Sequence, residues 1–271
     1  MSLPLLSAIL PHHDPSRAQL CRKTVNNFVR QNYLPFELIV VNGTDTPIVT
    51  NDAINGEEYK ADGCVVKEIF VPSGNAATMR NHGIQEAVGD WIAPIDNDDW
   101  FHPQRFLYQM AHRVPKRPCL LENQLKMDIS PLLEMLKENQ VGESFRPMLH
   151  LESNPKGIPS TMIFPRVLND SEWRYDESLN VGEHAELLDR MRQKANITPV
   201  VCPNRHTQLI TGLSWPVLSV AMYHGTNELE FNQFFEGLPE PRDVSLVPSG
   251  LNQKDVDLIK TMLRSYNFSV N

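Results

Sequence analysis

Three carboxylates stand within four residues at the end of an apolar run, in the sequence WIAPIDNDDW of residues 91–100. Asp96, Asp98 and Asp99 cannot all be buried without a compensating cation, protonation or water, because isolated buried carboxylates are costly. Mg²⁺ and Mn²⁺ prefer oxygen ligands and complete their shell with water and the phosphate oxygens of a ligand. The pattern therefore indicates a metal and diphosphate site. The alternative is a solvated turn in which Asp99 caps the helix expected near Pro103.

A second group that could do chemistry opens a helix expected at residues 183–195. Glu183 and His184 are its first residues, and its apolar positions are Leu187, Leu188 and Met191. The partial positive charge at the start of a helix disfavours imidazolium, so His184 should be neutral and able to accept a proton. Either residue could act as a general base, or each could be an ordinary first-turn residue. They lie about 100° apart around the helix axis, so both cannot point straight into one cleft.

Composition limits the classes of ligand. The chain has 271 residues, of which 41% are hydrophobic and 21% charged, as in an ordinary soluble globular protein. Its net charge of −8 and isoelectric point near 5.6 argue against a nucleic-acid-binding protein, which would normally show a basic face. Acidic lipids would find no general basic surface, although a peripheral membrane contact is left open. An anionic ligand must therefore be attracted by local cations or a metal.

The cysteines and the first residues indicate a compartment. Four cysteines lie far apart without a C-x-x-C pair, which is typical of core residues in a reducing environment: Cys21, Cys64, Cys119 and Cys202. The apolar run near residue 5 is too short for a signal peptide or a membrane span. We therefore expect a cytoplasmic protein.

The first part of the chain predicts a strand, helix and strand unit. Residues 5–10 form a continuous apolar run that suits a strand buried on both faces. Asp14 is a helix N-cap before Pro15, and the helix is expected to run to about residue 31. A second buried strand is expected at 36–41, parallel to the first. It ends in the polar turn 42–45, at the edge of the sheet where ligands bind in such folds.

The next elements bring the acidic cluster to the same edge. We expect a strand at 64–71, a helix at 75–88 and a strand at 91–95, whose carboxyl end lies beside that of the strand before Asn42. Arg80 lies away from the apolar stripe of its helix, as either a solvated surface charge or a nucleotide contact. Further helices are expected at 103–114, 131–138 and 183–195, and further strands at 120–129 and 197–202.

Three segments, in this order, resemble family 2 glycosyltransferases of the GT-A fold. They are LSAILPHHDP with NFVRQNYLPFELIVVNGTD, then PSGNAATMRNHGIQEAVGDWIAPIDNDDWFHPQRF, and then IPSTMIFPRVLNDSEWRYDESLNVGEHAELLDRM. Together they cover most of residues 4–195. The resemblance implies an α/β, Rossmann-like fold with a mostly parallel central sheet and helices on both faces. It also implies transfer of a sugar from a nucleoside diphosphate sugar to a hydroxyl of a glycan or other acceptor, with inversion at the anomeric carbon.

The resemblance also implies site residues and a cofactor. The nucleotide sugar is assigned to Pro11, Asn42, Arg80, Asp96, Asn97 and His206, the metal (Mn²⁺ or Mg²⁺) to Asp98 and Asp99, and catalysis to Glu183 and His184. Within these sets Asp96 would contact the ribose and Asp98 the metal that bridges the diphosphate. Arg80 would approach the nucleotide and Asn42 its base, and the loop with His206 would fold over the diphosphate.

Two positions depart from the family pattern. Asn42 stands where the family usually has an aspartate that accepts a hydrogen bond from uracil. An amide can also accept that bond, so UDP remains the expected nucleotide. His184 stands where the family has its aspartate base, beside Glu183. We favour Glu183 slightly, because a carboxylate is the usual base, although the ordinary imidazole pKa of about 6.5 is closer to working pH.

The expected organisation is a glycosyltransferase domain at 1–215 and an extension at 216–271. The extension contains a short amphipathic helix at 253–265, which packs back on the domain or docks to a second copy in a homodimer. One alternative function is a sugar-nucleotide nucleotidyltransferase, which would normally need a glycine-rich basic loop near the N-terminus. The other is a non-catalytic nucleotide-sugar or glycan-binding protein, which the altered pair Glu183 and His184 leaves open.

Overall fold

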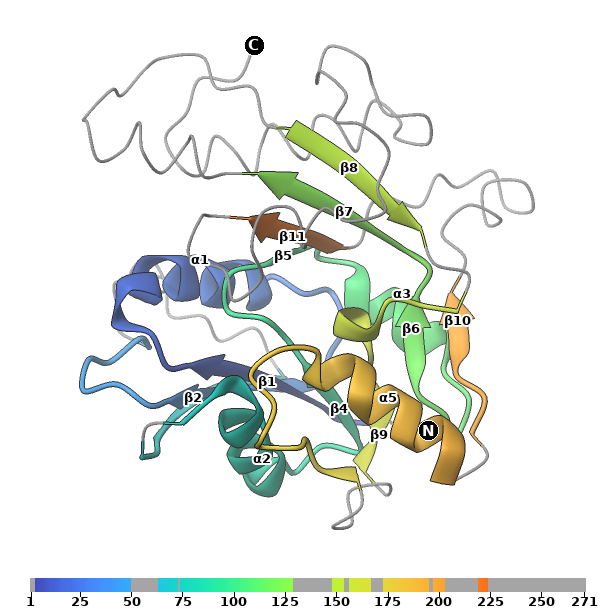
Figure 1. The fold of residues 1–271 in the computed structure, drawn as a ribbon, viewed down its shortest axis with the longest axis horizontal. Helices are drawn as coiled ribbons and strands as arrows, with labels where there is room; N and C mark the ends of the chain where they lie inside the picture. Colours follow the sequence, from blue (N-terminus) through green and yellow to red (C-terminus); the bar gives the residue numbers. More distant parts are fainter. Residues whose placement is uncertain are drawn as a thin grey trace.

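A five-stranded sheet forms the centre of the molecule (Figure 1). The computed structural model describes residues 3–49, 63–72, 74–128, 148–153, 156–166, 173–194, 197–202 and 219–223. The strand order is β3-β2-β1-β4-β9. The strands are β1 (Leu6–His12), β2 (Phe36–Asn42), β3 (Cys64–Phe70), β4 (Trp91–Pro94) and β9 (Phe164–Pro165).

The sheet is parallel except at one edge. β1 pairs in parallel with both β2 and β4, β2 pairs in parallel with β3, and only β9 is antiparallel to its neighbour β4. Every residue of β1 and β2 is buried, as the continuous apolar runs predicted. The mostly parallel α/β sheet is therefore confirmed. β1 and β4 end at the same edge, where their continuing chains carry the polar residues of the site.

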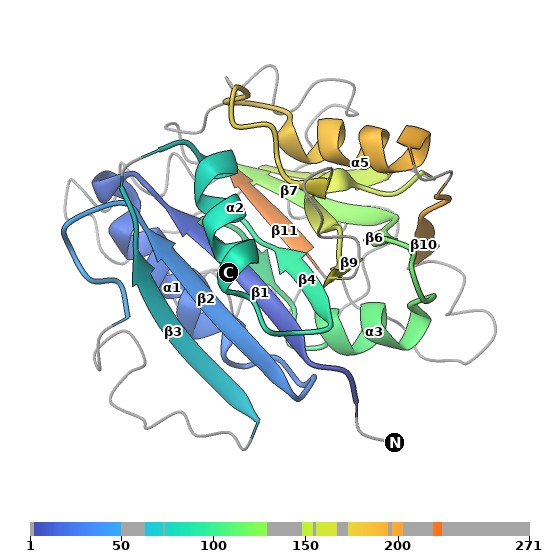
Figure 2. The same cartoon turned by 90° about the horizontal axis from the view of Figure 1, so that it is seen from below.

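Helices cover both faces of this sheet (Figure 2). The 3-10 turn η1 (Pro15–Arg17) leads into α1 (Ala18–Phe28), which shares one apolar core with α3 (Arg105–His112). The opposite core contains α2 (Ala76–Glu86) and α5 (Glu183–Lys194). Alternate residues of the central strands serve the two cores, because successive strand side chains point to opposite faces.

A second sheet stands beside the carboxyl edge of the first. Its strand order is β5-β11-β7-β8, and a separate parallel pair is formed by β6 and β10. The bounds are β5 (Trp100–Phe101), β6 (Cys119–Leu121), β7 (Asn123–Asp128), β8 (Met148–Ser153), β10 (Val200–Cys202) and β11 (Ser219–Tyr223). The short 3-10 turn η2 (Pro159–Thr161) lies between β8 and β9 in the chain.

Several expected boundaries differ from the observed ones. The strand expected at 120–129 is divided into β6 and β7, which belong to different sheets. The helix expected from Asp14 begins as a 3-10 turn, with Asp14 as its cap, since its carboxylate accepts a hydrogen bond from the Ser16 amide at 2.9 Å.

Other expectations concern the end of the chain. β11 lies in the segment expected to be an extension, and it pairs with β5 and β7. The division at residue 215 stays a prediction. The helices expected at 131–138 and 253–265 lie outside the described residues. In the part of the chain that is described, no helix is both long and apolar enough to span a membrane.

Gly83 lets α2 approach the central sheet closely. A Cβ atom at this position would lie 2.3 Å from Cγ2 of Ile9 and 2.9 Å from Cγ2 of Val41. We predict that Gly83→Ala lowers the free energy of unfolding, because overpacking costs about 1–3 kcal/mol and the better helix propensity of alanine returns at most about 1 kcal/mol. Urea unfolding measures this, with Glu86→Ala on the exposed side of α2 as the control. A variant as stable as the parent would contradict this packing.

Candidate functional site

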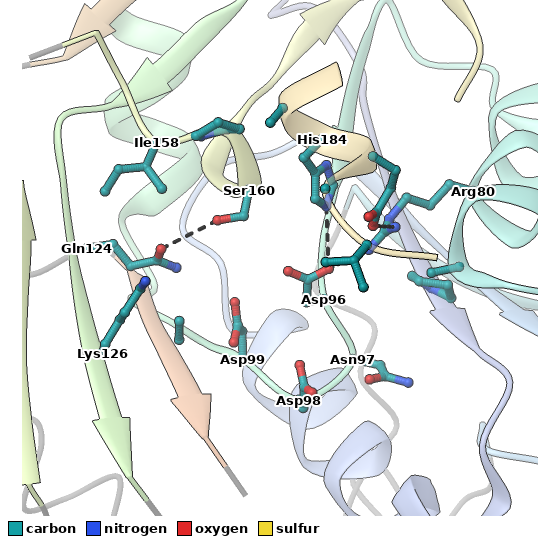
Figure 3. Close-up of a pocket in the computed structure, with 18 of the residues that line it drawn as sticks. Arg80, Asp96, Asn97, Asp98, Asp99, Gln124, Lys126, Ile158, Ser160 and His184 are labelled. Atoms are coloured by element: carbon teal, nitrogen blue, oxygen red, sulfur yellow. Dashed lines mark hydrogen bonds and ion pairs between the residues drawn. The ribbon is translucent and has the colours of Figure 1, made fainter. Parts of the chain in front are cut away.

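A pocket of about 310 Å³ opens at the carboxyl ends of β1 and β4 (Figure 3). This volume lies in the range of small-molecule sites. Its walls come from both sheets, α2, η2 and the start of α5. The polar residues among those that line it are His13, Arg17, Arg80, Asp96, Asn97, Asp98, Asp99, Gln124, Lys126, Ser160, Glu183 and His184.

Side chains of α1 hold the acidic turn, residues 96–99, in place. The Thr24 hydroxyl lies 3.0 Å from the carbonyl oxygen of Asn97 and 3.1 Å from that of Asp99, so its single proton is shared between them. The Asn27 side chain accepts a hydrogen bond from the Phe101 amide at 2.7 Å. The packed helix α1 therefore holds the backbone of the turn, and the aspartates of the turn line the pocket.

Arg80 joins two carboxylates from distant parts of the chain. Its guanidinium donates to Asp96 at 2.5 Å and also to Glu183, while its side chain is only 3% exposed. Burial alone would lower the pKa of Arg80, but the charges of Asp96 and Glu183 outweigh burial and raise it. The solvated alternative for Arg80 is therefore wrong. Its position off the apolar stripe suggested exposure, but Tyr175 and the first residue of α5 lie over Arg80.

Asp96 is the meeting point of Arg80 and His184. Burial would raise the pKa of its carboxyl, but the hydrogen bond from His184 and the charge of Arg80 lower it below the usual range. Asp96 is therefore ionised at neutral pH, and it forms the centre of a hydrogen-bonded group made by β4, α2 and α5.

His184 is held between Asp96 and Tyr175. Its Nε2 lies 3.5 Å from Oδ1 of Asp96, and its Nδ1 lies 2.9 Å from the Tyr175 hydroxyl. Burial raises the pKa of Tyr175, so the phenol stays protonated. A hydroxyl can donate to or accept from Nδ1, so Tyr175 is compatible with either neutral tautomer of His184. The ring position is thus fixed from both sides.

The other two carboxylates of the turn also have arginines near them. Arg17 Nη1 lies 3.4 Å from Oδ2 of Asp98. Arg105 is fully buried over the Phe101 ring, and burial lowers its pKa to about 10, although the charges of Asp99 and Asp96 act in the opposite direction. The compensating cations that the carboxylate cluster requires are therefore arginines of the chain itself.

Asp99 does not cap a helix. The residue before α3 is Gln104, which makes no capping hydrogen bond with its side chain, and Asp99 is 6% exposed in the pocket wall. The solvated-turn alternative is therefore wrong, because the turn is buried against α1 and the second sheet.

The acidic turn fits a divalent metal only in part. Asp98 and Asp99 offer the carboxylate oxygens that Mg²⁺ and Mn²⁺ prefer. Within the described ranges, no group of three or more histidine, cysteine, aspartate or glutamate side chains is arranged to hold a metal ion. The residues fit Mg²⁺ or Mn²⁺ when phosphate oxygens of a ligand and water complete the coordination shell.

Asn42 is not among the residues that line the pocket. Its side chain is fully buried, its amide nitrogen donates to the Thr46 carbonyl at 2.8 Å and to Glu68 at 2.7 Å, and its oxygen accepts from the Thr44 amide at 2.8 Å. These bonds fix the turn after β2. A contact with a nucleotide base would require Asn42 to give up an internal bond.

Of the remaining expected residues, two line the pocket and one lies outside the described residues. Pro11 and Asn97 line the pocket, and the Asn97 amide nitrogen finds no hydrogen-bond partner among the described residues. His206 lies outside those residues. The structure therefore brings eight of the expected site residues together in one pocket: Pro11, Arg80, Asp96, Asn97, Asp98, Asp99, Glu183 and His184.

Sequence reasoning missed the wall formed by the second sheet. Gln124 and Lys126 of β7 face the pocket on the side opposite Arg80, with the acidic turn between them (Figure 3). Gln124 accepts from the Ser160 hydroxyl at 3.4 Å and donates to the Ser219 hydroxyl at 3.1 Å. No local pattern marks these positions, because β7, η2 and β11 meet only through long-range pairing.

The chain matches a known family over part of its length. Residues 7–120 match the family described as Glycosyl transferase family 2. An uncharacterized glycosyltransferase of Haemophilus influenzae is 30% identical over 104 residues, which are 37% of this chain and 38% of the relative. The chain thus spans less than two fifths of that relative. The expected resemblance is confirmed for this segment.

Two solved structures share the fold. TarS of S. aureus, residues 1–349, superposes with a TM-score of 0.50 at 17% identity, covering 80% of this chain and 60% of that one. The mannosyltransferase PcManGT from Pyrobaculum calidifontis, in complex with GDP-Man and Mn²⁺, gives a TM-score of 0.52 at 12% identity, covering 84% and 59%. The expected GT-A fold is therefore confirmed.

The ion pairs of Arg80 generate a prediction about stability. Arg80→Gln leaves Asp96 and Glu183 close together without their cation, and removing one partner of a buried pair costs about 3–5 kcal/mol. Because the pKa of Asp96 is lowered, its contribution is present above the ordinary aspartate value near 3.9 and is lost as pH falls below it. Urea unfolding should therefore show a larger loss at pH 7 than at pH 3, because the contribution disappears only below the ordinary aspartate value.

Arg190→Gln is the matched control, since it removes the same charge from a helical pair with Glu186 near the surface. Such a pair is worth about 0–1 kcal/mol. Equal losses for the two variants would show that the Arg80 pairs do not stabilise the fold.

Proposed function

We propose that this protein, which carries a glycosyltransferase family 2 segment on a GT-A fold, transfers a sugar from a nucleoside diphosphate sugar to an acceptor hydroxyl. We further propose that the reaction uses Mn²⁺ or Mg²⁺ and inverts the anomeric carbon. The observation that carries this proposal is the pocket in which the acidic turn and the start of α5 face one space. Transfer needs both a site for the leaving diphosphate and a base for the acceptor.

The acidic turn suits the diphosphate of the donor. A divalent metal would be held by Asp98, with Asp99 beside it, and would neutralise charge that develops on the departing diphosphate. Asp96 and Asn97 would contact the nucleoside. The solved mannosyltransferase of the same fold has GDP-Man and Mn²⁺ bound, which supports a donor of this class.

The base is assigned to His184. Glu183, which the sequence slightly favoured, already accepts a hydrogen bond from Arg80, so its carboxylate is engaged within the protein. In the neutral tautomer that carries its proton on Nδ1 and donates it to the Tyr175 hydroxyl, Nε2 of His184 would take the proton of the acceptor hydroxyl as that oxygen forms its bond to the anomeric carbon. The bond between that carbon and the diphosphate oxygen breaks, and the diphosphate leaves with the electron pair. Asp96 would stabilise the imidazolium that results.

We propose a nucleoside diphosphate sugar as the donor, without a preference for one nucleobase. UDP was expected from Asn42, but the internal hydrogen bonds of that side chain to Glu68 and Thr44 remove the support for base recognition. The acceptor is proposed only as a hydroxyl, of a glycan or another molecule, that reaches His184. A non-catalytic binding protein is the alternative, and metal-dependent hydrolysis of a nucleotide sugar separates the two.

We predict that Asp98→Asn removes the metal-dependent part of nucleotide binding. Asparagine keeps the shape of the side chain and loses the charge. Calorimetry with UDP and with GDP should show Mn²⁺-dependent affinity in the parent and a loss of at least about 10-fold in the variant. Mutating a residue that only hydrogen-bonds to a metal ligand already costs about 10-fold, so losing the ligand itself should cost at least as much. Tyr33→Phe, remote from the pocket, is the control. Unchanged Mn²⁺ dependence in Asp98→Asn would refute the metal assignment.

The assignment of the general base to His184 gives a second prediction. His184→Gln should lower the turnover of the tightest-bound nucleotide sugar by about 10² to 10⁴ while its affinity is kept, because a base acts in the transition state. Glu183→Gln should lower turnover less. Initial rates of nucleoside diphosphate release, with or without acceptor, provide the measurement. A severe loss in Glu183→Gln with an active His184→Gln would assign the base to Glu183, and full activity in both would remove the base from this helix.

A further inference from the structure

Arg17 contacts the carboxylate to which the metal is assigned. Its guanidinium lies between two aspartates, with Nη1 3.4 Å from Oδ2 of Asp98 and Nε 3.5 Å from Oδ2 of Asp14. Arg17 is 8% exposed and lines the same pocket as Asp98. Asp14 is more exposed and is fixed by hydrogen bonds from Ser16, so it anchors Arg17 at the pocket rim.

This contact places two positive charges in competition for one carboxylate. A divalent cation at Asp98 would repel a guanidinium a few ångströms away, and the pocket wall screens that repulsion less than bulk water does. Among the described residues, no group of three or more histidine, cysteine, aspartate or glutamate side chains is arranged to hold a metal ion and so to compensate. The protein alone should therefore bind a metal weakly as long as Arg17 keeps this position.

A diphosphate would offer Arg17 a second partner in the same pocket. The planar guanidinium matches phosphate oxygens as well as it matches a carboxylate, and it forms paired hydrogen bonds with both. A diphosphate also supplies the further oxygens that Mn²⁺ or Mg²⁺ requires beside one or two carboxylates. Moving Arg17 from Asp98 to the diphosphate would thus free a metal ligand and satisfy the guanidinium in one exchange.

We propose that Arg17 is an exchangeable counter-ion, which pairs with Asp98 in the empty pocket and with the diphosphate of the donor in the loaded one. This inference rests on the proposed function, because it takes a nucleoside diphosphate as the ligand. The consequence is coupling: nucleotide binding raises the affinity for the metal, and metal binding raises the affinity for the nucleotide by the same factor. Arg17 thereby prevents the site from holding a metal without its donor.

The test measures Mn²⁺ binding without any turnover. The full chain is titrated with Mn²⁺ alone, then with Mn²⁺ at saturating UDP or GDP, and free Mn²⁺ is followed by electron paramagnetic resonance. The parent should bind Mn²⁺ weakly alone and about 5- to 150-fold more tightly with the nucleotide, the usual size of coupling between two sites.

Two variants at the same position separate the explanations. Arg17→Gln should bind Mn²⁺ alone about 10-fold more tightly than the parent, since the competing charge is gone, and should lose most of the gain caused by the nucleotide. Arg17→Lys keeps a charge but cannot form the paired contact, so its coupling should be smaller than in the parent and larger than in Arg17→Gln. Arg192→Gln, which removes the same charge on α5, should behave as the parent.

The outcomes distinguish this inference from the proposed function. If the parent binds nucleotide with Mn²⁺ but Arg17→Gln binds Mn²⁺ alone no more tightly, Arg17 is a fixed structural partner and only the inference fails. Should Arg17→Gln not fold, unchanged coupling in Arg17→Lys overturns it equally. If the parent binds neither UDP nor GDP at any Mn²⁺ concentration, the proposed function and the inference both fail.

Discussion

The charge of the acidic turn is the constraint on which the rest of this site depends. Asp96, Asp98 and Asp99 lie in a pocket wall beside the buried Glu183, and such a group repels itself unless cations stand close to it. Arg80 pairs with Asp96 and Glu183, Arg17 contacts Asp98, and the charge of Asp99 acts on the buried Arg105. The arginines come from η1, α2 and α3, so the charge balance of the turn fixes how three helical elements meet the sheet.

This balance also explains how the fold could serve chemistry at one edge. The parallel strands β1 and β4 end together, so the acidic turn and the β1 end share one rim of the pocket. α5 then closes the opposite rim, and Arg80 joins its first residue Glu183 to Asp96. A site held by opposite charges can exchange partners when an anionic ligand enters, whereas a site held by apolar packing cannot. Of these arginines, Arg17 and Arg80 also line the pocket, so they stand where an anionic ligand would meet them.

Local patterns were sufficient to predict the first half of the fold. Continuous apolar runs predicted β1 and β2, and the capping residue Asp14 marked the start of the first helical segment. The acidic turn was found because three carboxylates after an apolar strand are visible in a short window. The family resemblance added the pairing of this turn with the start of α5, which lies more than eighty residues away in the chain.

Contacts between distant segments limited how much of the remaining fold and of the site could be predicted from the sequence. Arg80 was ambiguous because its partner Glu183 lies 103 residues further along the chain, and no helical periodicity reports such a partner. Asn42 has the right residue type and edge for base recognition, but its bonds to Glu68 and Thr46 give it a structural role. The β7 and β11 wall was missed because strands of a mixed sheet find their partners through tertiary packing rather than through their own sequence.

A crystal structure of the full chain grown with Mn²⁺ and GDP or UDP would test the central claim most directly. The account predicts that the diphosphate lies in this pocket, that the metal contacts Asp98 and the phosphate oxygens, and that the Arg17 guanidinium has left Asp98 for the diphosphate. A nucleotide bound elsewhere on the protein, or a diphosphate in the pocket with its metal away from the acidic turn, would contradict it.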